Sequence, residues 1–83
     1  EIRKTDLFER LRALRKKLSD NRGIPPYMVF SDKTLIEIVK KTPRDREQFL
    51  SCSGVGQNKY QQFGEEFIRE IRSYLSEQSQ SKT

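Results

Sequence analysis

The sequence predicts an all-α fold, and three observations support that prediction. Apolar residues recur at helical spacing in several segments, where each step along the chain turns the helix by about 100°. Prolines, glycines and capping residues separate these segments. No segment shows the alternation of apolar and polar residues that is typical of a strand. We therefore expect four or five short helices that share one core and are joined by tight connections.

The first helix is expected to begin near Thr5, which suits an N-cap, with Asp6 in its first turn. Gly23 is predicted to end this helix in a left-handed conformation. The apolar residues in between form one stripe, made of Leu7, Leu11, Leu14 and Leu18. After the helix, Pro25 and Pro26 predict an extended path or a single turn. Because residues 24–30 are mostly apolar, we expect this stretch to lie across the core.

A second helix is expected to start after Ser31 as its N-cap and to run to about Lys41. Its predicted inward residues are Leu35, Ile36, Ile38 and Val39. Thr42 then suits the N-cap of a third helix, with Pro43 at its first position and Asp45 completing a capping box. That third helix would bury Phe49, Leu50 and Cys52.

Residues 53–56 form a glycine-containing turn that leads into a short helix ending near Gly64. The last helix begins with Glu65 and Glu66, and its apolar stripe consists of Phe67, Ile68, Ile71, Tyr74 and Leu75. From residue 76 onward the chain is polar, which favours disorder. The sequence therefore predicts a linker at residues 1–5, a helical domain at 6–75 and a disordered polar tail at 76–83.

The composition limits the chemistry of the chain. It has 83 residues, the size of one small domain, with no histidine and a single cysteine, Cys52. This excludes an internal disulfide and a zinc site built from cysteine and histidine, and it removes the commonest general base. A phosphate-binding G-x-x-x-x-G-K-[ST] loop is also missing. We therefore expect no catalytic site, metal or cofactor in this chain. With no apolar run of about 18 residues and no signal peptide, we expect an intracellular protein.

Charge is concentrated in the first half of the chain. The formal net charge is +5, and residues 1–46 carry 13 basic and 7 acidic side chains, against 4 basic and 5 acidic in residues 47–83. A basic domain of this size suggests a polyanionic partner such as nucleic acid. Two basic clusters stand out, one from Arg10 to Arg22 and one formed by Lys40, Lys41, Arg44 and Arg46. Such residues also occur on helix faces that only contact solvent, and the pattern leaves both readings open.

Tyr27 is the candidate aromatic residue for a nucleic-acid site, because it follows two prolines on a stiff segment. Basic side chains neutralise phosphates, and an aromatic ring stacks on an unpaired base. The alternative is that Tyr27 packs in the core beside its apolar neighbours, and from the neighbours alone burial is favoured.

Gly54 and Gly56 lie between two predicted helices, with Lys59 one turn further on. In helix-hairpin-helix elements, glycine amides at such a turn contact a phosphate. The simpler interpretation, which we favour, is that the glycines permit a sharp turn and close packing. Cys52, beside this turn, is then a small core residue.

The order of these motifs is more specific than any one of them. It runs Phe8-x-x-Leu11-Arg12-x-Leu14-Arg15, then Ile24-Pro25-Pro26-Tyr27-x-Val29-Phe30-Ser31-Asp32-x-Thr34-Leu35, then Pro43, Phe49-Leu50 and Gly54-Val55-Gly56-x-x-Lys59-x-x-x-Phe63-Gly64-x-x-Phe67. Over about residues 6–75, this set closely resembles the HRDC (helicase and RNase D C-terminal) domain. The Pro-Pro-Tyr-x-Val-Phe segment is most similar to that of RecQ-family DNA helicases, and RNase D-type proteins are the alternative parents.

The resemblance implies a small orthogonal bundle of about five short helices, attached to an ATP-dependent 3′–5′ DNA helicase that works in DNA repair and recombination. Such domains help to engage single-stranded or partly duplex DNA, and ATP and magnesium are expected only in the parent motor. A tyrosine of the Pro-Pro-Tyr segment is implicated in DNA contact in bacterial members, and Tyr27 matches it. The resemblance therefore favours an exposed, DNA-facing Tyr27.

Together these arguments predict a monomeric auxiliary domain that binds single-stranded or junction DNA and no membrane. Tyr27 would stack on a base, and the predicted phosphate contacts are Arg12, Arg15, Lys16, Arg22 and Lys33. A second basic surface (Lys40, Lys41, Arg44 and Arg46) and a hairpin contact (Gly54, Gly56 and Lys59) remain open. The alternatives are a protein-interaction module that docks on the helicase core or a repair partner, and an RNA-directed domain of an RNase D-like nuclease. The compartment would be the bacterial cytoplasm or nucleoid, or the eukaryotic nucleus.

Overall fold

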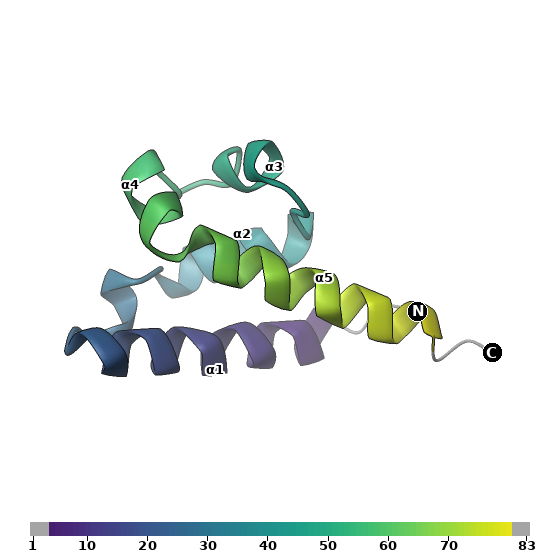
Figure 1. Cartoon of the computed structure of the whole chain (residues 1–83), viewed down its shortest axis with the longest axis horizontal. Coiled ribbons are helices and arrows are strands. Elements are labelled where there is room, and N and C mark those ends of the chain that lie inside the picture. Colours follow the sequence, from purple (N-terminus) through teal and green to yellow (C-terminus); the bar gives the residue numbers. More distant parts are fainter. Residues whose placement is uncertain (1–3, 81–83) are drawn as a thin grey trace.

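The computed structural model describes residues 4–80 and confirms the all-α prediction, since no strand occurs within that range. Its elements are α1 (Lys4–Arg22), the 3-10 turn η1 (Pro26–Met28), α2 (Asp32–Lys41), α3 (Arg46–Leu50), α4 (Gln57–Lys59), the π-helical turn η2 (Tyr60–Gly64) and α5 (Glu65–Gln80). In Figure 1, α1 and α5 extend along the long axis, with α2 behind them and α3 and α4 on the far side of α5 from α1. None of the helices between residues 4 and 80 has the length and apolar character needed to cross a membrane.

Helix α1 ends as the sequence predicts. Gly23 has a φ of +67°, the Ile24 N–H donates to the Ser19 carbonyl at 3.0 Å, and the Gly23 N–H donates to the Asp20 carbonyl at 3.2 Å. These bonds satisfy carbonyls at the end of the helix. Glycine adopts the left-handed conformation without a steric clash because it has no Cβ. The start differs from the prediction, because the helix already includes Lys4 and Thr5, so Thr5 is not the N-cap. Residues 1–3 of the predicted linker lie outside the described residues.

The core is organised around Phe30. Its ring centroid lies 5.0 Å from that of Phe67, 5.8 Å from that of Phe49 and 6.2 Å from that of Phe63, in tilted or edge-to-face geometry. Such aromatic pairs contribute about 0.5–1.5 kcal/mol beyond the apolar area that they bury. Since the four rings come from four different segments, Phe30 ties the chain after η1 to α3, η2 and α5.

Helix α2 begins at its predicted cap, because the Ser31 side chain accepts a hydrogen bond from the Thr34 N–H. Leu35, Ile38 and Val39 are buried as expected, but Ile36 is 46% exposed. At about 100° per residue, Ile36 lies past the edge of the stripe centred between the other three. The prediction that Ile36 points inward is therefore wrong.

The link between α2 and α3 also differs from the prediction. Thr42 is the C-cap of α2 in a left-handed conformation (φ +42°), and its N–H donates to the Ile38 carbonyl at 2.8 Å. The N-cap of α3 is Asp45, whose carboxylate accepts from the Gln48 N–H at 2.8 Å. Pro43 is buried between the two helices rather than at the first position of α3. A carboxylate at Asp45 captures the free amide of the first turn, so the helix starts after it.

Past α3, the chain packs closely against α2. Phe49 and Cys52 are buried as predicted, and Leu50 is half-buried. Gly54 has a φ of +88°, and a Cβ at this position would collide with Oγ1 of Thr34. The interpretation of this glycine as a device for a sharp turn and close packing is confirmed.

The chain is helical without interruption from α4 through η2 into α5, because Tyr60 and Glu65 at the junctions both keep right-handed helical geometry. The short helix predicted to end near Gly64 therefore continues as a π-helical turn into the last helix. Helix α5 runs to Gln80, so residues 76–80 are helical and their predicted disorder is wrong. An ion pair of 2.8 Å between Arg10 and Glu77 fastens this last part of α5 to α1. Residues 81–83 lie outside the described residues.

Candidate nucleic-acid interface

Tyr27 lies on the surface, at the middle of η1. Pro25 is extended, and the turn is closed by bonds from the Met28 N–H to the Pro25 carbonyl and from the Val29 N–H to the Pro26 carbonyl, both 3.0 Å. This single turn leaves Tyr27 68% exposed while Val29 and Phe30 are buried. Apolar neighbours thus gave the wrong expectation for Tyr27, and the exposed position that the family resemblance favoured is confirmed. Of residues 24–30, Val29 and Phe30 are buried in the core and Ile24 packs against it while half-buried.

Arg15 fixes the position of the turn. Its guanidinium donates to the Phe30 carbonyl at 2.9 Å and pairs with Asp32 at 2.8 Å, and its side chain is only 11% exposed. These contacts join α1 to the residues that follow η1 and to the first turn of α2. The Arg15 guanidinium is therefore already bonded to protein groups, whereas the sequence predicted that it would contact a phosphate.

Arg12 and Lys16 lie beside the turn, at a hollow of about 340 Å³ that is also lined by Glu9, Ala13, Arg15 and Pro26. Arg12 pairs with Glu9 at 3.5 Å and Lys16 with Asp20 at 3.2 Å, and the two basic side chains are 52% and 74% exposed. Exposed pairs within one helix contribute about 0–1 kcal/mol, so both cations exchange their partners at little cost. The structure brings these two predicted residues to the Tyr27 segment.

Two further cations lie around the ring of Phe63, and one of them, Lys59, contacts η1. The Arg22 guanidinium is 4.8 Å from the ring centroid and donates to Gln62 at 3.1 Å. The Lys59 ammonium is 6.0 Å from the same centroid and donates to the Met28 carbonyl. Lys59, considered in the sequence only with the glycine turn, thus lies at the Tyr27 segment. Lys59 and Met28 are 31 positions apart in the sequence, so their contact can be seen only in the folded structure.

The remaining predicted residues have different surroundings. Lys33 is exposed in the first turn of α2, next to the Asp32 that pairs with Arg15. Gly56 is exposed at the N-cap of α4. Among the described residues, neither Lys33 nor Gly56 forms a hydrogen bond or an ion pair with η1, and their predicted phosphate contacts remain predictions.

The predicted second basic surface divides into two parts. Lys41 pairs with Glu37 at 3.1 Å and donates to the Ser51 carbonyl at 3.2 Å, next to the exposed Lys40. Arg46 instead lies over the Tyr60 ring, 5.7 Å from its centroid. The Arg44 carbonyl, between them in sequence, accepts a bond of 2.9 Å from Nε of Arg72.

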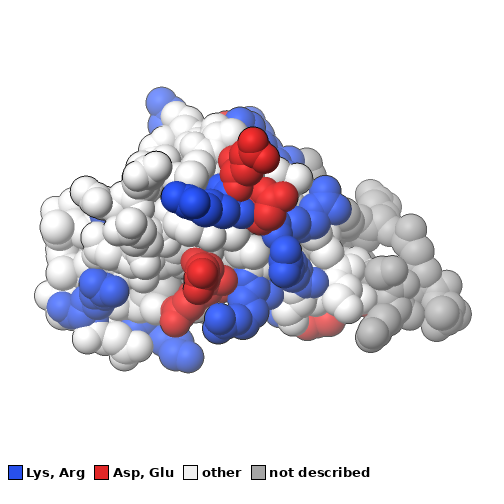
Figure 2. Space-filling model, turned by 45° about the horizontal axis from the view of Figure 1, so that its top comes forward, with Lys and Arg blue, Asp and Glu red and all other residues white. Residues whose placement is uncertain are grey.

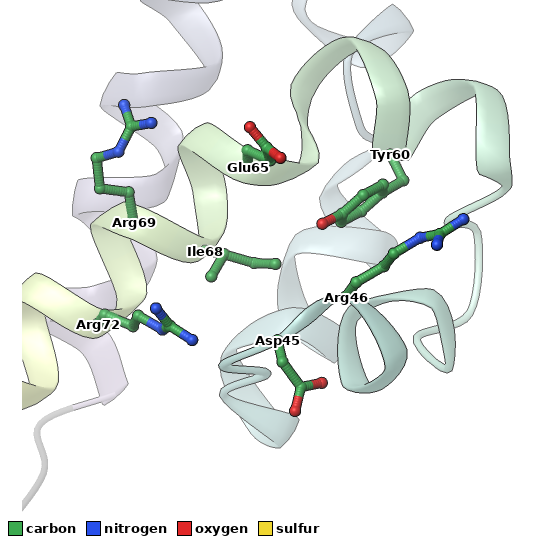
Figure 3. Close-up of a pocket in the computed structure, with 7 residues that line it drawn as sticks. All are labelled: Asp45, Arg46, Tyr60, Glu65, Ile68, Arg69 and Arg72. Atoms are coloured by element: carbon green, nitrogen blue, oxygen red, sulfur yellow. The ribbon is translucent and has the colours of Figure 1, made fainter.

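Arg46 shares a hollow with two arginines of α5 that the sequence reasoning missed, Arg69 and Arg72. Figure 3 shows the residues around it. The spacing of Arg69 and Arg72 on the polar face of the last helix is a signal that could have indicated a second basic group. Figure 2 shows that acidic and basic side chains are intermixed on this side of the molecule rather than forming a uniformly basic face.

Comparisons with known proteins identify the family to which this fold belongs. The HRDC domain family matches residues 4–71. The chain belongs to the HRDC domain family. It is 45% identical over 69 residues to the ATP-dependent DNA helicase RecQ of Bacillus subtilis, which covers 83% of this chain and 12% of the helicase. The RecQ helicase of Haemophilus influenzae is 44% identical over 69 residues, with coverage of 83% and 11%.

A solved structure shows the same fold. The third HRDC domain of D. radiodurans RecQ superimposes with a TM-score of 0.84 at 29% identity, over 87% of this chain and 95% of that domain. The ATP-dependent DNA helicase UvrD2 of Mycobacterium tuberculosis is more distant, at 30% identity over 67 residues, covering 81% of this chain and 10% of the helicase. This HRDC domain therefore spans about an eighth of the length of the RecQ helicases it matches.

Proposed function

We propose that this HRDC domain binds DNA as an auxiliary domain of a RecQ-like helicase, with a preference for single-stranded or junction DNA, and serves DNA repair and recombination. The observation that carries the proposal is Tyr27, a 68% exposed aromatic ring on a proline-fixed turn whose flanking residues Pro26 and Met28 lie at Arg12 and Lys16 and at Lys59, respectively. The relatives are named as DNA helicases, which supports DNA as the ligand. ATP and magnesium would serve the parent motor, and this domain, as a monomer, would need no cofactor.

Tyr27 would select unpaired DNA by stacking. A ring that stacks on a base contributes about 1–3 kcal/mol and tolerates any base. In a duplex, both faces of an internal base are already covered by its neighbours, so the ring finds no partner there. Because Pro25 and Pro26 already fix the backbone before Tyr27, little conformational entropy is lost when the ring is ordered on a base.

Phosphates would be neutralised on both sides of the ring. Arg12 and Lys16 lie at the hollow next to Pro26, and Arg22 and Lys59 lie around Phe63. A strand that crosses η1 would pass from one pair to the other, with its base over Tyr27. Arg15 would position the turn rather than bind the strand, because its guanidinium already bonds Phe30 and Asp32.

The test is fluorescence anisotropy of labelled single-stranded DNA, of the same sequence as duplex, and of the matching RNA, each titrated at several salt concentrations. We expect salt-dependent binding with a preference for the single strand. The Tyr27→Ala variant should weaken single-strand binding by about 1–3 kcal/mol, whereas Tyr27→Phe should retain most of it because the ring remains. Thermal unfolding of both variants checks that the fold is intact.

The other outcomes discriminate between the alternatives. Stronger binding of RNA than of DNA would indicate the RNA-directed domain of an RNase D-like parent. No binding of any nucleic acid at low salt would refute the DNA proposal and favour a module that docks on protein. Equal binding by the wild type and a folded Tyr27→Ala variant would show that stacking plays no part.

A further inference from the structure

A second site lies at a hollow of about 350 Å³ between the start of α3 and the first half of α5. It is lined by Asp45, Arg46, Tyr60, Glu65, Ile68, Arg69 and Arg72. The floor is apolar, because Ile68 is 8% exposed. In Figure 3 the Tyr60 hydroxyl and the Arg72 guanidinium point toward the space beside Ile68 from opposite sides. None of these residues belongs to the Tyr27 segment or to the cations around it.

Several polar groups at this hollow have spare capacity. Arg72 uses Nε for the Arg44 carbonyl, which leaves its terminal nitrogens as donors. Within residues 4–80, no hydrogen bond or ion pair involves the Tyr60 hydroxyl or the guanidinium groups of Arg46 and Arg69. The Arg46 guanidinium lies over the face of the Tyr60 ring. In Figure 3 the Tyr60 hydroxyl and the Arg72 guanidinium face the apolar floor, as in sites that take a small anionic group with an apolar neighbour, whereas the Arg46 and Arg69 guanidinium groups lie at the rim.

We propose that this hollow binds a short acidic peptide segment of a partner protein, with one carboxylate between Tyr60 and Arg72 and a neighbouring apolar side chain on Ile68. A planar carboxylate matches the fork of a guanidinium, and each charge-assisted bond is about twice as strong as a neutral one. Arg46 and Arg69 would add positive potential at the rim. The volume suits one or two side chains, which fits a linear segment better than a large domain interface.

Two features favour a peptide over a nucleic-acid strand. Asp45 and Glu65 line the same hollow, so it suits a ligand with one carboxylate between Tyr60 and Arg72 better than a phosphate backbone, which is charged at every nucleotide. Arg46 already lies over the ring of Tyr60, so a base could stack on that face only by displacing the guanidinium. The two faces of the domain would therefore separate their ligands, with DNA at Tyr27 and an acidic peptide at Tyr60, and neither proposal depends on the other.

The test is an NMR titration of the ¹⁵N-labelled domain with an end-blocked hexapeptide that carries one carboxylate beside an apolar residue, Ser-Gly-Leu-Glu-Gly-Ser, and with a control peptide in which Gln replaces Glu. We expect saturable shift changes at the amides of α3, η2 and the first half of α5 with the acidic peptide only. Tyr60→Phe, which keeps the ring and its packing, and Arg72→Gln should each lower the affinity roughly tenfold. Arg12→Gln, with the same loss of charge at the Tyr27 face, should leave the affinity unchanged.

The same spectra contain the results that would overturn the proposal. No shift changes around Tyr60 at millimolar acidic peptide, or equal changes with the amide peptide, would exclude recognition of a carboxylate. Changes that Arg12→Gln weakens as much as Arg72→Gln would reveal only a general attraction to positive charge. If single-stranded DNA shifts the amides of η2 and α5 and the peptide does not, the hollow is part of the nucleic-acid surface.

Discussion

Helix α1 has basic residues along two edges, one toward α5 and one toward η1, and these residues have different roles. On the edge toward α5, Arg10 pairs with Glu70 at 2.7 Å and with Glu77 at 2.8 Å and lies over the Tyr74 ring, with only 29% of its side chain exposed. On the edge toward η1, the Lys16 side chain is 74% exposed and forms an ion pair with Asp20 of its own helix. The first edge holds two helices together, and the second leaves its charge available to a ligand.

The tyrosines show the same division. Tyr74 is 1% exposed under Arg10, while Tyr27 is 68% exposed between two pairs of cations. A basic residue beside an aromatic ring is therefore no sign of a binding site by itself. The clearest difference is between Arg10, which pairs with two carboxylates of another helix, and Arg12 and Lys16, which pair with carboxylates one turn away on α1.

The largest expected effect is on the free energy of unfolding, where a core residue, Phe67, is compared with a surface residue, Tyr27. Phe67 is fully buried and its ring packs edge-to-face on Phe30, so Phe67→Ala should lower the free energy of unfolding by about 3–5 kcal/mol. The exposed Tyr27→Ala should change it by no more than about 0.5 kcal/mol. Urea unfolding followed by circular dichroism measures both. A loss of similar size in Tyr27→Ala would mean that the turn is part of the structural edge.

Arg15 provides the next contrast, because it lies on the Tyr27 side yet bonds like a structural residue. Arg15→Gln should destabilise the domain by about 1–3 kcal/mol, since the Phe30 carbonyl and the Asp32 carboxylate lose their charged partner. Arg12→Gln, at a 52% exposed position, should change stability by no more than about 0.5 kcal/mol. The midpoints of urea unfolding compare the two variants. Equal midpoints would assign Arg15 to the ligand-binding group.

Local chemistry made most of the fold predictable. The Ser31 cap, the Gly23 stop and the stripe of α1 depend on residues within one or two turns of each other. The errors arose where local signals competed or where distant residues decide. Thr42, Pro43 and Asp45 offered two possible starts for α3, and the structure uses the later one. The end of α5 looked disordered because its anchor, Arg10, is 67 positions away from Glu77.

The candidate site was predictable only in part for the same reason. Arg12 and Lys16 share a flank of one helix, so their grouping followed from helical spacing. The arrival of Lys59 at the Met28 carbonyl, and of Arg69 and Arg72 beside Arg46, depends on how the helices pack. Sequence spacing contains no information on such contacts between elements.

A smaller effect should distinguish the two edges of α1 by salt dependence. Lys16 and Lys17 are adjacent in the chain, but Lys17 lines a hollow with Glu66 and Glu70 of α5. Lys16→Gln should reduce the salt slope of single-strand binding by about 0.7, the value expected for one phosphate contact. Lys17→Gln has the same change in charge and should leave the slope unchanged. Equal changes in both variants would mean that DNA responds to net charge and not to the Tyr27 face.

The smallest effect concerns the pH dependence of the α1–α5 edge. The hydrogen bond between Glu77 and Arg10 lowers the pKa of Glu77 and raises the pKa of Arg10. A carboxyl whose pKa is depressed in the folded state stabilises the fold above its ordinary pKa of about 4.3, and this stabilisation is lost as the pH falls through the lower folded value. Glu77→Gln should therefore have a slightly lower melting temperature than the wild type at pH 7.

The two melting temperatures should converge at low pH, once the pH has fallen through the lowered pKa of Glu77 and the wild-type carboxyl is also protonated. Glu66→Gln, a change of the same kind at an exposed position of α5, controls for the loss of one carboxylate. NMR chemical shifts of residues 76–80 report the local result, because the last turn of α5 should fray in Glu77→Gln and remain helical in Glu66→Gln. If the difference in melting temperature were the same at both pH values, Glu77 would act through packing, and the two edges of α1 would differ in contacts and not in charge.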